Sequence, residues 1–157
     1  MVKKARIPTI LQNNPELHKS IRELGGYYLS LLFYVNRHIR TIDFNIDEIN
    51  RYYLYFKNIG YLNKNSIPKF PCKILEYFGF SLVSCRHERV TAAAGEHNFT
   101  IFEVYIDSLD TVHHIAKRGR TTLYDSRDLL KQGIKCRNTA QLIFSYYKVL
   151  ANTQSVI

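Results

Sequence analysis

The sequence predicts a single α+β domain, spanning 1–157, in which N-terminal helices pack on a C-terminal antiparallel sheet. Apolar residues in the first half recur at the i, i+3, i+4 spacing of amphipathic helices. The second half is instead rich in alternating β-branched and aromatic residues. Helices followed by strands are typical of the α+β class. We expect residues 1–12 to form a flexible arm and residues 151–157 a tail.

Four helices are expected in the first half of the chain. Asn14-Pro15 combines a capping side chain with proline at the first helical position, so a helix should run from there to about Glu23. It should stop at Gly25-Gly26, where the next helix begins. The apolar positions of the second and third helices are Tyr28, Leu31, Leu32, Val35 and Ile39, then Ile46, Ile49, Tyr53 and Phe56.

Glycines mark the ends of the later helices. The third helix should end at Gly60, and a short fourth helix should open at Pro71 and close at Gly79, where left-handed backbone angles are favoured.

Strands are expected in the second half, followed by a final helix. "FSLVSC" (80–85) and "NFTIFEVYI" (98–106) have the composition and alternation of strands. "TVHHIA" (111–116) and "TTLYD" (121–125) read as a hairpin, because "KRGR" places a glycine at the turn between them. After Asn138 the spacing is again helical. The apolar face of this last helix would carry Ala140, Ile143, Phe144, Tyr147 and Leu150.

Composition narrows the class of protein. Hydrophobic residues make up 46% and aromatics 13%, which excludes a disordered chain. No apolar run approaches the roughly 18 residues of a membrane span, and the N-terminus lacks a signal-peptide core, so we expect a cytoplasmic protein without a membrane partner. The net charge of +9 allows nucleic-acid binding, but the basic residues are dispersed, which favours a generally basic surface.

Cysteine and histidine spacing suggests no metal site, and the sequence implies no cofactor. Cys72, Cys85 and Cys136 form neither a disulfide framework nor a CxxC motif. Several histidines are present, but their spacing matches no common ligand motif. These are His87, His97, His113 and His114.

The hairpin brings a histidine and a carboxylate together. If Arg118-Gly119 forms a two-residue turn, His113 lies across from Tyr124, and Asp125 lies within one residue of that pair. A carboxylate beside an imidazole orients the ring and stabilises its protonated form. A helix N-terminus such as the one after Gly25-Gly26 lowers the pKa of a cysteine, and a histidine from a sheet can pair with the thiolate.

This order of elements resembles the compact bacterial form of the papain-like superfamily, the peptidases that process double-glycine leaders. More closely, the sequence is similar to an uncharacterised plasmid-borne family of Borrelia spirochaetes. The resemblance covers nearly the whole chain, from "LQNNPEL" to "FSYYKV". The segments that carry it are "GGYYLSL", "FNIDEINRYYLYFKNIGYLNKN", "PCKILEYFG" and "HHIAKRGRTTLYDS".

The resemblance implies a papain-like fold and assigns roles to individual positions. The catalytic cysteine of the superfamily falls on Gly26, so the nucleophile is missing. The catalytic histidine falls on His113 and its orienting carboxylate on Asp125. The oxyanion-hole glutamine usually lies shortly before the nucleophile, where Ser20 stands; Gln12 is the nearest glutamine.

The function expected from these positions is binding rather than catalysis. A papain-like domain without its thiol would hold a peptide or protein segment in the groove of the former active site and would not cleave it. Two alternatives stay open: a basic plasmid- or phage-associated nucleic-acid binder, and a hydrolase that uses an unrecognised nucleophile. The oligomeric state does not follow from the sequence.

Overall fold

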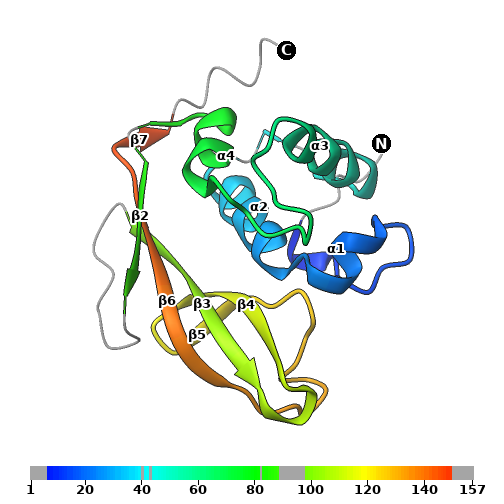
Figure 1. Ribbon diagram of the computed structural model, residues 1–157. Coiled ribbons are helices and arrows are strands. Elements are labelled where there is room, and N and C mark those ends of the chain that lie inside the picture. Colours follow the sequence, from blue (N-terminus) through cyan, green and yellow to red (C-terminus); the bar gives the residue numbers. More distant parts are fainter. Residues whose placement is uncertain (1–6, 40, 43, 82, 89–97, 150–157) are drawn as a thin grey trace.

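The expected α+β class is confirmed by the computed structural model, which describes residues 7–39, 41–42, 44–81, 83–88 and 98–149. Figure 1 shows the helices gathered on one side of the molecule and the sheet on the other, with α2 between the other helices and the sheet. The helical elements are η1 (Ile7–Thr9), α1 (Lys19–Leu24), α2 (Gly26–His38), α3 (Ile46–Asn58) and α4 (Pro71–Phe78).

The second half of the chain forms an antiparallel sheet of five strands in the order β2-β6-β3-β4-β5. The strands are β2 (Ser84–Glu88), β3 (Asn98–Ile106), β4 (Thr111–Arg118), β5 (Thr121–Tyr124) and β6 (Arg137–Ser145), and η2 (Asp107–Leu109) joins β3 to β4. A second, two-stranded sheet pairs β1 (Phe80–Ser81) with β7 (Lys148–Val149). The expected strand over 80–85 is therefore divided between two sheets.

Three of the four expected N-terminal helices lie where the sequence places them. Asn45 caps α3 by accepting a hydrogen bond from the backbone N–H of Glu48 at 2.8 Å. Pro71 opens α4, and Gly79 closes it with a left-handed φ of 119°.

The first helix is shorter than expected and begins at Lys19 rather than at Asn14-Pro15. The Asn14 side chain accepts a hydrogen bond from the backbone N–H of Glu16 at 2.9 Å and so closes a local turn instead of capping a helix. Asn-Pro is also a turn signal, and here the turn is formed. His18 caps α1 instead, through Nδ1 and the N–H of Ser20.

Residues 7–12 fall within the expected flexible arm, and they lie against the helices. Ile7 and Ile10 are buried in the main core, and the backbone N–H of Gln12 donates to the carbonyl of Ser126 at 2.7 Å. Residues 1–6 and the expected tail lie outside the described residues.

The expected final helix is wrong, because residues 137–145 form strand β6. β6 lies between β2 and β3, and its buried side chains come in successive pairs, Ala140 with Gln141 and Ile143 with Phe144, rather than at alternate positions. Such a strand loses its alternation, and its apolar residues can imitate helical spacing. Tyr147 lies beyond β6 and is exposed, and Leu150 lies outside the described residues.

The hairpin of β4 and β5 is confirmed, but its expected register is wrong. Arg118 pairs with Thr121, and a bulge after Ala116 brings Ala116, not His113, across from Tyr124. A bulge inserts an extra residue on one strand and cannot be seen in the turn residues from which the register was predicted.

Helix α2 is the centre of the core. Its residues from Gly26 to Asn36 are buried, and two of its hydroxyls tie it to the sheet. Tyr34 donates to the carbonyl of Thr100 at 2.6 Å, and Ser30 donates to that of Gly26 at 2.8 Å and lies 3.4 Å from that of His114. Among the described residues, no helix is long and apolar enough to cross a membrane.

Candidate functional site

Gly25 allows α2 to start immediately after α1. Its N–H donates to the carbonyl of Ile21 at 2.8 Å, and the residue is both the C-cap of α1 and the N-cap of α2. A Cβ at this position would lie 2.5 Å from the Ile21 carbonyl oxygen and 2.8 Å from the Ile21 Cα. Because backbone atoms are in the way, only glycine fits the junction.

Gly26, the first residue of α2, lies directly against His113 of β4. A Cβ at Gly26 would lie 2.6 Å from both Cε1 and Nδ1 of the His113 ring, and 3.4 Å from the carbonyl oxygen of His114. The imidazole therefore occupies the space that a side chain at position 26 would need. The structure brings together the helix N-terminus and the histidine, two positions far apart in the sequence.

Asp125 holds the other side of the His113 ring. The Nε2 atom of His113 lies 2.8 Å from Oδ1 of Asp125, and the His113 side chain is only 3% exposed. Asp125 follows β5 directly, and its carboxylate also accepts from the backbone N–H groups of Arg127 at 3.0 Å and Leu129 at 2.9 Å. This turn carries the carboxylate to the histidine despite the shifted register.

The surroundings of Asp125 favour its ionised form. Burial alone would raise the pKa of this carboxyl, but the hydrogen bond and charge of His113 and the two backbone N–H groups together lower the pKa below its usual value. The His113 ring is thus fixed on one side by a carboxylate, while its Nδ1 faces Gly26.

Of the two residues considered for the oxyanion side, the structure places Gln12 at the site and Ser20 away from it. The Gln12 amide is buried; it donates to the carbonyl of Arg22 at 3.1 Å and accepts from the hydroxyl of Ser126 at 2.7 Å. Gln12 lines the cavity above Gly26, whereas Ser20 does not. Sequence distance was misleading because the chain folds back between residues 12 and 19.

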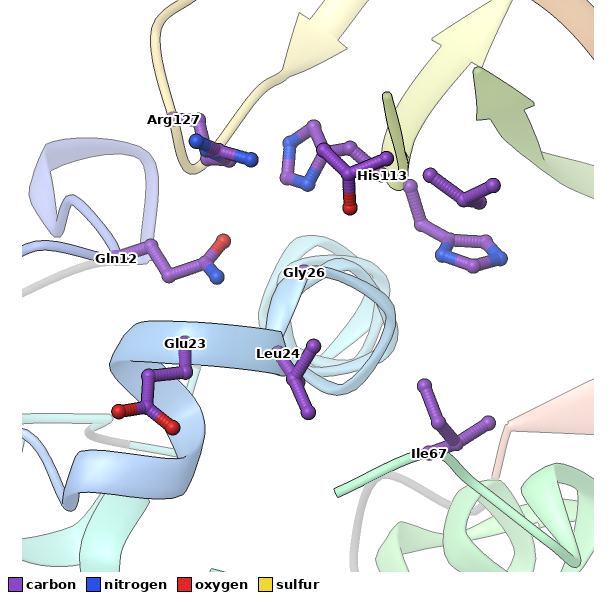
Figure 2. A pocket seen from close by; sticks show the side chains of 10 residues that line it. Gln12, Glu23, Leu24, Gly26, Ile67, His113 and Arg127 are labelled. Atoms are coloured by element: carbon purple, nitrogen blue, oxygen red, sulfur yellow. The ribbon is translucent and has the colours of Figure 1, made fainter. Parts of the chain in front are cut away.

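A cavity of about 210 Å³ lies over the N-terminus of α2. Figure 2 shows Gln12 pointing toward Gly26 from one side, with Leu24 and Ile67 on the other. The lining residues come from α1, α2, β4 and three loops; they are Gln12, Glu23, Leu24, Gly26, Ile67, Thr111, Val112, His113, His114 and Arg127. The cavity therefore combines polar groups near Gly26 with apolar side chains.

Sequence reasoning missed the contact of His114 with Tyr27. The two rings meet at a tilt of 31° with their centroids 4.7 Å apart, so the neighbours of Gly26 and His113 also meet. Burial, together with the charges of His113 and His87, lowers the pKa of His114 to about 4. The carboxylate of Glu103 at 4.0 Å does not offset this burial. The one signal for this contact in the sequence is that Tyr27 follows Gly26 and His114 follows His113.

His114 should make the fold sensitive to acid. Its pKa of about 4 in the folded chain lies below the usual value of 6.5, so the stabilisation is complete above pH 6.5 and is lost as the pH falls toward 4. We expect this residue alone to lower the free energy of unfolding by about 2 kcal/mol between pH 7 and pH 5. Urea unfolding at both pH values measures the change.

The control for this prediction keeps the aromatic ring. His114→Phe should remove most of the 2 kcal/mol dependence, whereas substitution of the exposed His87 by Gln should leave most of it in place. An unchanged pH dependence in His114→Phe would show that His114 is not buried as described.

No group of three potential metal ligands occurs within the described part of the chain. The cysteines are also separate from the site. Burial and the neighbouring Cys72 raise the pKa of the Cys85 thiol to about 12, and burial likewise raises the pKa of Cys72. None of the three cysteines lines the cavity over Gly26.

The arrangement defines an α+β domain with an oriented histidine at the N-terminus of a buried helix. The chain belongs to the family described as protein of unknown function DUF261, whose model matches residues 8–146. No curated protein matches the chain. No solved structure matches it either.

Proposed function

We propose that this protein is a non-catalytic relative of the papain-like cysteine peptidases and binds a peptide segment in the cavity over Gly26. One observation carries the proposal. The His113 ring keeps its carboxylate partner, Asp125, yet it rests where the side chain of a nucleophile at position 26 would stand. An oriented histidine and a helix N-terminus together stabilise the thiolate of a catalytic cysteine, and here only the thiol is absent.

Covalent catalysis lacks its usual nucleophiles at this site, because no cysteine or serine among the described residues lines the cavity. Glycine offers none, and the buried hydroxyl of Ser30 is directed at the carbonyls of Gly26 and His114. The raised pKa of the Cys72 and Cys85 thiols disfavours the reactive thiolate, and these residues lie on α4 and β2. We therefore infer that the domain binds without cleaving.

The edge of β4 supports the binding of an extended segment. β5 pairs with β4 only over residues 116–118, so residues 111–113 have no neighbouring strand on that side within the described part. These residues also line the cavity, and Val112 is exposed. An extended peptide can add to such an edge by main-chain hydrogen bonds, with side chains entering the adjoining cavity.

Peptide selection tests the proposal. Display of a random peptide library should enrich peptides whose affinity falls at least fivefold in Leu24→Glu, because this change replaces an apolar side chain of the cavity lining with a charged one. Leu54→Glu is the matched control: Leu54 is 46% exposed on α3 and Leu24 is 43% exposed. Fluorescence anisotropy of labelled peptides measures the affinity.

Three results would contradict this function. Peptides that bind equally to both variants would not occupy the cavity. Peptides that mass spectrometry finds cleaved would restore the hydrolase alternative. Binding only to nucleic acid, with affinity falling steeply as salt rises, would favour the basic surface instead.

A further inference from the structure

We propose that the cavity over Gly26 recognises the C-terminal end of a polypeptide by its terminal carboxylate. This inference rests on the proposed function and names the part of the peptide that the site would hold. It depends on three kinds of hydrogen-bond donor that come from separate parts of the chain and line one cavity.

The first donor is the amide of Gln12, which is only 3% exposed. One amide hydrogen is used in the bond to the carbonyl of Arg22, and the amide oxygen accepts from Ser126. The second amide hydrogen has no acceptor in the described part of the chain, and Figure 2 shows the amide directed toward Gly26. A buried donor without an acceptor costs free energy unless a ligand or water satisfies it.

The second kind of donor is the backbone at the start of α2. The first N–H of this helix with a backbone partner is that of Leu29, which donates to the carbonyl of Gly25 at 2.9 Å. The N–H groups of Gly26 and Tyr27 precede it and bond to no carbonyl of α1 or of the other described residues. The N-terminus of this 13-residue helix therefore presents partial positive charge at the cavity.

The third donor is the guanidinium of Arg127. It lines the cavity and forms no ion pair with any carboxylate in the described ranges. The acidic groups nearby are already engaged: Asp125 accepts from His113 and two backbone N–H groups, and Glu23 lies 3.7 Å from Lys19. Glu23 and Arg127 both line the cavity, and of the two only Arg127 has no ion-pair partner among the described residues, which suits an anionic group.

The remainder of the cavity favours a peptide end over a free anion. Leu24, Ile67 and Val112 line the same space, and such apolar surface gives nothing to an isolated phosphate. The last residue of a chain supplies a carboxylate for the donors and an apolar or small side chain for these contacts. The edge of β4 would continue the contact along the preceding residues.

Two pools of random hexapeptides test the inference, identical except that one ends in a free carboxylate and the other in an amide. Both are labelled with fluorescein at the N-terminus, and binding is followed by anisotropy. We expect the carboxylate pool to bind about tenfold more tightly. NMR should show the backbone N–H signal of Gly26 shifting only with the carboxylate pool.

Arg127→Gln should reduce the preference for the carboxylate pool to less than threefold. Arg120→Gln, at an exposed arginine in the hairpin turn, should leave the preference unchanged. Both substitutions are made outside the core, so both variants should fold, which circular dichroism verifies.

The outcomes separate this inference from the proposed function. Equal binding of the two pools, lost in Leu24→Glu, would overturn carboxylate recognition and leave peptide binding standing. Displacement of the carboxylate pool by inorganic phosphate as readily as by acetyl-glycine would overturn it in favour of a general anion site. If neither pool shifts the Gly26 signal, both proposals are overturned.

Discussion

The thiol introduced by Gly26→Cys should react with iodoacetamide at pH 6 about tenfold faster than the thiol introduced by Leu24→Cys. Position 26 is the first residue of α2, and the Nδ1 atom of His113 faces it. Leu24 lines the same cavity but is the last residue of α1, so it is not at the N-terminus of a helix. A helix N-terminus and an imidazolium lower a cysteine pKa from about 8.5 into the range of roughly 3.5 to 7.5. Mass spectrometry of the labelled peptides gives the two rates.

The new side chain must first displace the ring. Its Cβ would start 2.6 Å from Cε1 and Nδ1 of His113, and these atoms belong to the end of a side chain that can tilt. Circular dichroism should show that the variant is folded before reactivity is measured. Turnover need not accompany reactivity.

Removal of the histidine provides the control. Addition of His113→Ala to Gly26→Cys should return the rate to that of the Leu24→Cys thiol. If the cysteine at 26 titrates near its ordinary value of about 8.5 with or without His113, the site was not arranged for a thiolate, and the papain-like part of the proposal fails.

Gly25→Ala should lower the free energy of unfolding by about 3 kcal/mol. The backbone angles of Gly25 are open to any residue, with φ at −85°, so the cost is steric rather than conformational. The added methyl group would meet the carbonyl oxygen of Ile21 at 2.5 Å, and this backbone group cannot turn away without breaking the α1–α2 junction. Urea unfolding at pH 7 measures the loss.

Gly26→Ala is the matched control, because its methyl group meets a side chain instead of the backbone. It should cost about 1.5 kcal/mol, chiefly through the weakened bond between His113 and Asp125. In a His113→Ala background that cost should disappear, while the cost of Gly25→Ala should remain. Equal losses for the two glycines would contradict the steric account.

Three of the four N-terminal helices were predictable from the sequence because their signals are local. α3 and α4 carry caps and closing glycines within a few residues of their ends, and α2 begins directly after Gly25, where a Cβ would meet backbone atoms. β6 was not predictable in this way. Its neighbours β2 and β3 lie far away in the chain, and burial of successive residues removed the alternation on which strand prediction depends.

The candidate site shows the same division. His113 and Asp125 were found because a short hairpin joins them, even though a bulge changes the register through which they meet. By sequence distance alone, Gln12 is a weaker candidate than Ser20 for the oxyanion side. Its place follows from the backbone bond between Gln12 and Ser126, which joins residues more than a hundred positions apart and leaves no local trace in the sequence.

The ring of His113 resting on Gly26 also restricts how this chain can change over generations. Every amino acid other than glycine has a Cβ, so any substitution at 26 meets a ring that Asp125 holds in place. Natural selection for a folded chain alone would then retain glycine at 26, even in a lineage that no longer needs the cavity. A side chain at 26 would require the His113 ring to tilt away from it, so a change at one of these two positions alters the constraint on the other.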